Sequence, residues 1–322
     1  MPPLHRALLV DIGGTNTRVA IAQGAELVTS SILRFRNTEF SGLDQVLAAY
    51  AAKQGPIEVQ GACVDIAGPV HNGVGTLTNL DWTLEEPLIA KWANAPVAAL
   101  INDLQAQGHG VADLPPQALH RVVDSSGARA GSTRLVVNVG TGFNAAVVFD
   151  LGDHRLVPAS ESGHANLPIR TEADLRLCRF VENIHGFPAI EDVLSGRGLE
   201  RVYHWLGTEE GDPVQLPAAE IMAQATTGTS ARAINALRVF TRIFGTVCGN
   251  LSLIHLPFGG VYLVGGVACA LGRHLHGFGF AEAFRDKGRF AGMMSNFAID
   301  VIEDDYAALR GNARHLARLM AT

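Results

Sequence analysis

Cysteine is scarce in this sequence, and its scarcity excludes two kinds of protein. Four cysteines occur among 322 residues, and no two of them form a Cys-x-x-Cys pair; they are Cys63, Cys178, Cys248 and Cys269. Isolated thiols of this kind predict neither a disulfide framework nor a zinc site. They indicate small buried side chains in a reducing compartment, and we expect a cytoplasmic protein.

Long apolar runs and runs of basic residues are also missing. Only four consecutive apolar residues precede Asp11, too few for the core of a signal peptide. The most apolar stretch, residues 250–272, contains His255, Pro257 and five glycines, so we expect no membrane-spanning helix there. With a net charge of −6 and no Lys/Arg run, the chain gives no reason to expect a nucleic acid or membrane partner.

What is present fits a soluble globular enzyme of one large or two medium domains. Apolar residues make up 48% of the chain and charged residues 17%. Short apolar runs alternate with amphipathic segments, which predicts an α/β fold with mixed sheets. The longest predicted helix begins at Ser230 and carries an apolar stripe that we assign to the core.

The most informative segment runs from Asp11 to Arg18 and contains two adjacent glycines between two apolar runs. This pattern predicts strand, tight turn, strand. Glycines allow backbone N–H groups to converge on an anion, and a carboxylate beside them suits Mg²⁺ or its waters. The segment therefore suggests nucleotide phosphate bound without a Walker loop, although an ordinary hairpin explains it equally well in isolation.

A second hairpin repeats this pattern about one domain later. The run 135–139 is followed by Gly140, Thr141 and Gly142 and then by another apolar run, with Asn138 in the place that Asp11 holds in the first hairpin. Two similar hairpins suggest two topologically related lobes.

Other polar residues stand where a substrate could be held. Asp103 follows an apolar strand, where it could act as a general base or merely cap the next helix. Glu161 and His164 offer the mixed acceptors and donors that sugar hydroxyls require. The pairs Gly259-Gly260 and Gly265-Gly266 flank a buried strand, where they fit either an adenosine site or tight packing.

Taken together and in this order, the segments resemble the proteobacterial-type glucokinases of the sugar kinase, Hsp70 and actin superfamily. Residues 11–18, 140–142 and 259–266 are similar to the family's two phosphate motifs and its adenosine motif. Its sugar-binding positions are matched by Asn102, Asp103, Glu161, His164 and Glu191. Further matching segments are Thr78-Asn79-x-x-Trp82, Glu191–Leu199 and Asp286–Phe290.

The resemblance implies a two-lobed actin-like ATPase (ribonuclease H-like) fold, with mixed β-sheets flanked by helices and a cleft between the lobes. We expect a small α/β domain of residues 1–103 plus 303–322 and a large α/β domain of residues 104–302. The family likeness also suggests a homodimer. The Cys-x-Cys zinc cluster of the ROK sugar kinases is absent from the sequence, which separates the chain from that branch.

The activity implied by the resemblance is ATP-dependent phosphorylation of glucose at its 6-hydroxyl. Asp103 would be the catalytic base, and glucose would be bound by Asn102, Asp103, Glu161, His164 and Glu191. Asp11 would orient Mg²⁺ through water, while Arg18 would brace its turn rather than touch phosphate. ATP would be bound by Asp11, Gly13, Gly14, Thr15, Asn16, Gly140, Thr141, Gly142, Gly265 and Gly266.

The sequence departs from the family pattern at Asn144 in the second phosphate loop, at Ser162 beside the sugar positions, and at Asp304-Asp305, which replaces an Asp-Asn pair. Asn144 stands where bacterial glucokinases usually have Gly, and Ser162 where they commonly have Gly. Ser162 could narrow the sugar pocket. A kinase of another hexose, a non-catalytic sugar sensor and an actin- or Hsp70-like ATPase remain alternative interpretations.

Overall fold

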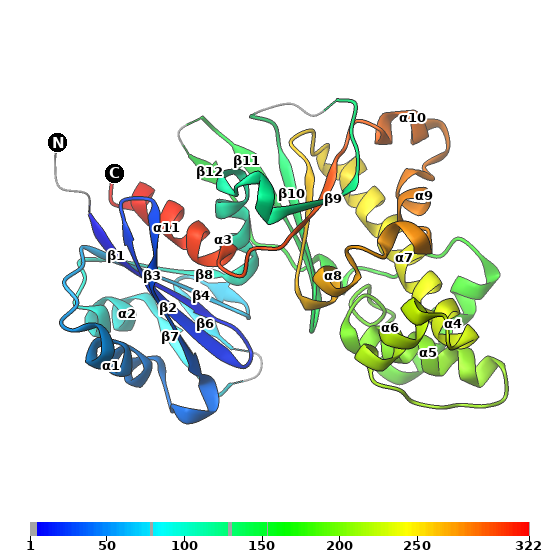
Figure 1. Cartoon of the computed structure of the whole chain (residues 1–322), viewed down its shortest axis with the longest axis horizontal. Coiled ribbons are helices and arrows are strands. Elements are labelled where there is room, and N and C mark those ends of the chain that lie inside the picture. Colours follow the sequence, from blue (N-terminus) through cyan, green and yellow to red (C-terminus); the bar gives the residue numbers. More distant parts are fainter. Residues whose placement is uncertain (1–4, 78–79, 128–130, 153, 322) are drawn as a thin grey trace. The chain divides into compact units, whose positions relative to one another are not determined.

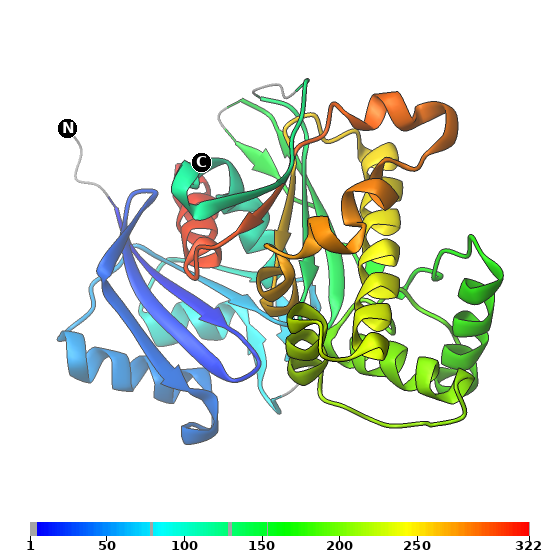
Figure 2. The same ribbon diagram turned by 45° about the vertical axis from the view of Figure 1, so that its right-hand side comes forward.

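Two compact units make up the described part of the chain, which the computed structural model covers at residues 5–77, 80–127, 131–152 and 154–321. The first unit runs to Pro115, returns for Asp150–Ala159 and resumes at Asp304. The second unit consists of Pro116–Phe149 and Ser160–Glu303. Figures 1 and 2 show the elements of each. Thr78 and Asn79, part of one matching segment, lie outside the described residues.

A five-stranded mixed sheet forms the centre of the first unit. Its order is β3-β2-β1-β4-β8, with bounds Arg6–Ile12 (β1), Asn16–Gln23 (β2), Glu26–Arg36 (β3), Gly61–Ile66 (β4) and Val97–Asn102 (β8). Strand β1 pairs antiparallel with β2 and parallel with β4, which in turn pairs parallel with β8. The carboxyl ends of β1, β4 and β8 therefore meet at one edge.

Both faces of this sheet are buried because side chains alternate along each strand. On β1, Leu8 and Val10 join one core cluster, while Ala7 and Leu9 join another. Helices α1 (Leu43–Gln54) and α2 (Glu86–Ala93) supply the first cluster, and α3 (Asp103–Gly110) and α11 (Ala307–Leu319) supply the second. The two pairs of helices cover opposite faces in Figure 1.

The observed unit boundaries differ from the expected ones. The first domain was expected to end at residue 103, but the unit continues to Pro115 and also includes Asp150–Ala159. The reason is that α3 packs closely against α11, so a Cβ on Gly311 would overlap the backbone oxygen of Ala106. Gln105 and Arg155 then tie the 150–159 segment to this unit: Gln105 Nε2 donates to the Val157 oxygen at 2.8 Å, and Arg155 pairs with Asp113 at 2.6 Å.

The first unit's described residues also form four short strands. A three-stranded sheet of order β5-β6-β7 comprises Val70–His71, Val74–Thr76 and Thr83–Glu85, and β12 covers Arg155–Leu156. Among the residues that the structure describes, no helix is long and apolar enough to cross a membrane.

The second unit repeats the strand arrangement of the first. Its sheet includes the order β11-β10-β13-β14-β9, with bounds Leu119–Val123 (β9), Arg134–Val139 (β10), Phe143–Asp150 (β11), Val261–Val264 (β13) and Ile299–Ile302 (β14). As with β1, strand β10 pairs antiparallel within its hairpin and parallel with the next strand, β13. This confirms that the two hairpins belong to topologically related sheets.

Helices dominate the rest of the second unit. They are α4 (Glu172–His185), α5 (Gly196–Glu209), α6 (Ala218–Thr227), α7 (Ala231–His255), α8 (Gly266–Leu271), α9 (Phe280–Arg285) and α10 (Ala291–Met294). The long helix α7, yellow in Figure 2, begins at an N-cap formed by Ser230, whose hydroxyl accepts from the Ala233 N–H. Its stripe, including the fully buried Phe240 and Phe244, lies in the core as expected.

Candidate active site

The first Gly-rich turn joins β1 to β2 and is braced from outside by Asn37. The amide of Asn37 donates to the Gly13 oxygen at 2.8 Å, and its backbone N–H donates to the Thr15 oxygen at 2.9 Å. The Thr17 hydroxyl donates to the Asn37 side chain at 2.8 Å. Because these bonds hold the turn's shape, Gly14 and Thr15 remain exposed and can meet a ligand.

Asp11 and Arg18 face each other across this hairpin. They are paired in the strand register, and Arg18 donates to the Asp11 carboxylate at 2.7 Å. Burial lowers the pKa of Arg18, but the adjacent Asp11 outweighs it and the net pKa is raised. The expected bracing contact of Arg18 is therefore present. The contact also occupies one oxygen of Asp11.

Carboxylates gather where the three parallel strands end. In the pairing register Asp11 stands opposite Asp65 of β4, and Asn102 stands opposite the next residue of β4, Ile66. The sequence analysis did not identify Asp65. The available signal was a lone carboxylate within the apolar run of β4, at the strand-end position that Asp11 occupies on β1.

Asp65 is fully buried and lies against two of these neighbours. Burial, then the charges of Asp11 and Asp103, raise its pKa well above the usual value, and hydrogen bonding to Asn312 of α11 counteracts this. Its Oδ1 receives no hydrogen bond from an N–H or O–H group of the described residues.

Asn102 and Asp103 sit at the junction of β8 and α3. The expectation weighed Asp103 as a possible helix cap, and the structure gives that position to Asn102: its Oδ1 accepts from the Leu104 N–H at 2.9 Å in a capping box with Gln105. The Asn102 amide donates to the Gly68 oxygen at 2.9 Å. Asp103 accepts from the Leu104 N–H at 2.8 Å through Oδ1 and is partly exposed.

In the second unit, the turn at Gly140–Gly142 contacts the predicted sugar residue Glu191. The carboxylate of Glu191 accepts from the Phe143 N–H at 3.0 Å, and a Cβ on Gly142 would lie 2.5 Å from its Oε2. Gly140 is bonded to Gly196 at the start of α5, whose N–H donates to the Gly140 oxygen at 2.9 Å. The second turn and the Glu191 carboxylate are therefore in direct contact and are held together by a hydrogen bond.

Glu161 and His164 border a single 3-10 turn, Ser162–His164, beside the second Gly-rich turn and Glu191. A Cβ on Gly163 would overlap the Phe143 oxygen, and Gly163 accepts from the Glu191 N–H at 2.9 Å. The side chains of Glu161 and His164 are exposed. The structure thus places Glu161, His164, Glu191 and the second turn together.

Two of the departures, Asn144 and Ser162, are bonded to each other. The N–H and hydroxyl of Ser162 both donate to the Asn144 Oδ1 at 3.1 Å, and the Asn144 amide donates to the Ser160 oxygen. The Ser162 hydroxyl is therefore engaged by Asn144. The sequence alone did not connect these two positions.

Gly265 and Gly266 begin helix α8 next to the second turn. Gly265 has φ of 96°, and a Cβ there would overlap the Asn138 Oδ1, so this glycine is required by packing. Gly266 is exposed, and a Cβ there would meet nothing within 4 Å. The packing interpretation holds for Gly265, while Gly266 leaves space for a ligand beside it.

The predicted residues fall into two sets, one in each unit. The first unit holds Asp11, Gly13, Gly14, Thr15, Asn16, Asn102 and Asp103, and the second holds Gly140, Thr141, Gly142, Glu161, His164, Glu191, Gly265 and Gly266. Each set combines a Gly-rich turn with polar side chains. Within the described residues, no group of three or more His, Cys, Asp or Glu side chains could hold a metal ion directly.

Comparison with known proteins assigns the chain to a family. The family model described as glucokinase matches residues 8–319. The chain belongs to the glucokinase family. The glucokinase of Chromobacterium violaceum is 30% identical, over 100% of this chain and 92% of its own length. The glucokinase of Nostoc sp. is 29% identical, over 96% of this chain and 98% of its own length.

Solved structures agree with this assignment. The crystal structure of a glucokinase from an Antarctic psychrotroph is similar with a TM-score of 0.87 and 27% identity, covering 98% of this chain and 99% of that one. A ROK hexokinase from Thermus thermophilus shares the fold with a TM-score of 0.69 at 18% identity, covering 98% of this chain and 100% of that one. Sugar kinases with and without the ROK label thus share this mixed α/β fold.

Proposed function

We propose that this member of the glucokinase family transfers the γ-phosphoryl group of ATP to the 6-hydroxyl of glucose, giving glucose 6-phosphate and ADP. The observation that carries the proposal is the family match over residues 8–319, which includes both Gly-rich turns and Asp103. A non-catalytic sensor would not need to keep a partly exposed carboxylate beside a phosphate turn.

Asp103 is proposed as the general base. It follows β8 at the edge near which Asp11 lies in β1, and its Oδ1 is oriented by the Leu104 N–H. From there it would accept the 6-hydroxyl proton as that oxygen attacks phosphorus. Glu161, His164 and Glu191 would bind the other hydroxyls, with Glu191 held by the Phe143 N–H.

The two Gly-rich turns are proposed to hold the phosphates from two sides, and Gly266 to leave room for the nucleoside. This role requires both units to act on the same substrates, in a two-lobed enzyme whose lobes close when sugar binds. Closure would exclude water and so limit wasteful ATP hydrolysis. The repeated hairpins, one per unit, support this reading.

Mg²⁺ fits Asp11 better through water than by direct coordination. One Asp11 oxygen already bonds Arg18, and no three ligand side chains of the described residues converge on a common point. Mg²⁺ retains several waters in most phosphate sites and neutralises charge on the transferred group. Asp11, fixed by Arg18, would orient those waters. We also propose that the chain lies outside the zinc-containing ROK branch, since it lacks a Cys-x-Cys pair.

The bond between Asn144 and Ser162 favours one second candidate, a kinase of another hexose. Ser162 lies between Glu161 and His164, so its attachment to Asn144 sets the spacing of the two proposed sugar ligands. A change there would alter which hydroxyl pattern fits best.

A coupled ADP-release assay with ATP–Mg²⁺ and a panel of glucose, mannose, fructose and glucosamine tests both candidates. Glucose is expected to give the highest kcat/KM. The variant Asp103→Asn is expected to lower kcat at least ~100-fold and to leave ATP affinity nearly unchanged. The matched control Asp44→Asn, at an exposed carboxylate on α1, is expected to retain full activity. Wild-type turnover by the Asp103 variant would refute its assignment.

A further inference from the structure

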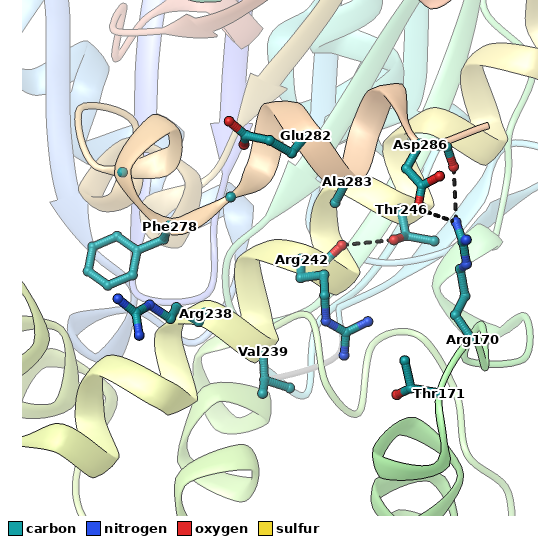
Figure 3. A pocket seen from close by; sticks show the side chains of 12 residues that line it. Arg170, Thr171, Arg238, Val239, Arg242, Thr246, Phe278, Glu282, Ala283 and Asp286 are labelled. Atoms are coloured by element: carbon teal, nitrogen blue, oxygen red, sulfur yellow. Dashed lines mark hydrogen bonds and ion pairs between the residues drawn. The ribbon is translucent and has the colours of Figure 1, made fainter. Parts of the chain in front are cut away.

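A cavity of about 680 Å³ lies within the second unit, apart from the residues assigned to catalysis. Its walls are the loop before α4, one face of α7 and the segment from η5 (Leu275–Phe278) into α9, as Figure 3 shows. The lining includes three arginines, Arg170, Arg238 and Arg242. All of these walls belong to one unit, so the cavity is a property of that unit alone.

Two of the arginines are held in place by carboxylates. Arg242 makes a two-pronged contact with Asp174, whose side chain is 1% exposed, while 35% of the Arg242 side chain stays exposed. Arg170 pairs with Asp286 at 2.9 Å and also donates to its backbone oxygen at 3.0 Å. Arginines fixed in this way lose little freedom when they bind an anion.

The third arginine, Arg238, has an exposed side chain and makes no ion pair with the described residues. It precedes Arg242 by one helical turn, and like charges at this spacing destabilise a helix. Figure 3 shows both side chains projecting from neighbouring turns of α7. Because Arg242 is already paired with Asp174, Arg238 carries the charge that an anion would compensate, and the planar guanidinium forks suit the oxygens of a phosphate group.

The other lining residues include apolar and acidic side chains. Phe278, Val239 and Ala283 supply apolar surface, so the cavity can also hold the carbon portion of a ligand. Glu282 and Asp286 supply negative charge from the α9 side; Asp286 is already paired with Arg170. The acidic wall directs an anionic group toward α7, where Arg238 and Arg242 lie.

We propose that this cavity binds a small organic phosphate, with its phosphate oxygens on Arg238 and Arg242 and its apolar or ring portion against Phe278 and Val239. The proposal is independent of the proposed catalytic function. It concerns a binding site whose occupancy can be measured without turnover.

Calorimetric titration of the full chain with phenyl phosphate and with inorganic phosphate tests the proposal. Phenyl phosphate is expected to bind more tightly, because only it reaches the apolar wall. Arg238→Ala is expected to weaken both ligands about tenfold, the loss of one charge-assisted contact. Arg179→Ala, an exposed arginine on α4 outside the cavity, is the matched control and is expected to change neither affinity.

A second variant and a second condition complete the test. Phe278→Ala is expected to weaken phenyl phosphate selectively, which a general loss of folding would not do. Binding is expected to persist with saturating glucose and a non-hydrolysable ATP analogue. Loss of binding under that condition would overturn the proposal, because it would place the phosphate on the catalytic turns. No binding, equal affinity for both probes, or affinities unchanged by Arg238→Ala would overturn it as well.

Discussion

At the scale of single residues, the first unit concentrates negative charge at the ends of its parallel strands. Asp11 is stabilised by Arg18, whereas Asp65 is fully buried and bonded to the neutral amide of Asn312. Burying an ionised carboxylate without a cation is costly. This cost raises the pKa of Asp65. Burial is the largest cause of the increase, and the charges of Asp11 and Asp103 are the next largest.

Asp65→Asn is therefore expected to stabilise the protein at neutral pH. As pH rises above the usual carboxyl pKa, the unfolded chain releases the Asp65 proton while the folded chain retains it, so stability falls with increasing pH. The amide removes this loss. The gain should be present at pH 7.5, where the unfolded chain has lost this proton, and small at pH 4.

Urea unfolding at both pH values measures this gain. The exposed carboxylate variant Asp44→Asn serves as the control and should change stability little at either pH. An equal gain at pH 4 and pH 7.5 would show that packing, and not the proton on Asp65, is responsible.

At the scale of elements, helices α3 and α11 form the most closely packed pair in the first unit. Gly110 and Gly311 allow their backbones to touch, and His109 lies against His315 with ring centroids 4.5 Å apart. Burial lowers the pKa of His109 to about 3 and that of His315 to about 4; in each case nearby positive charge adds to the effect. The two rings are therefore neutral in the folded protein at neutral pH.

Acid is expected to destabilise the protein through this histidine pair. Below the ordinary pKa of about 6.5, the unfolded chain takes up two protons that the folded pair rejects, so stability falls with decreasing pH. The contribution is full above about pH 7 and declines toward pH 4, by up to roughly 2.7 kcal/mol per pH unit for two protons. Urea unfolding between pH 4.5 and 8 provides the slope.

Two variants separate the pair from other titrating groups. His315→Gln is expected to lower the slope by about half, while His71→Gln, an exposed histidine, should leave it unchanged. Identical slopes in all three proteins would assign the acid sensitivity to other groups.

The elements also show what the sequence could and could not predict. Both Gly-rich hairpins, the strand before Asp103 and the helix from Ser230 follow from local patterns of apolar residues, glycines and caps, and each is present. Asp65, Asn312 and the bond between Asn144 and Ser162 were not predicted. The Asp65–Asn312 bond and the Asn144–Ser162 bond each join residues that are far apart in the chain. Local patterns of apolar residues, glycines and caps do not show which distant residues will meet.

At the scale of the whole molecule, each unit has its own apolar core. The second unit is built around one cluster that includes Phe240 and Phe244, and the first has separate clusters on the two faces of its sheet. Independent cores permit independent unfolding of the units. The proposed sugar ligands are divided between the units, so a bound sugar would link their stabilities.

Glucose is accordingly expected to raise the stability of both units together. At a concentration 100 times its Kd, a ligand that binds only the folded protein contributes about 2.7 kcal/mol. In scanning calorimetry, two transitions without glucose should move upward and merge when it is added. A shift confined to one transition would mean that the sugar contacts only one unit.

The first unit is built from segments that are far apart in the sequence, the last of which begins at Asp304. Its completion during synthesis therefore depends on the end of the chain. Leu316 of α11 fills the same core cluster as Leu9 of β1, and Asn312 bonds Asp65 beside Asp11. A ribosome completes every strand of the second unit before it makes this helix. Until then the sheet that carries Asp11 and Asp103 lacks α11 from one of its covering layers. The edge proposed to be catalytic is thus completed last, and we expect a chain that ends before α11 to lack a finished first unit.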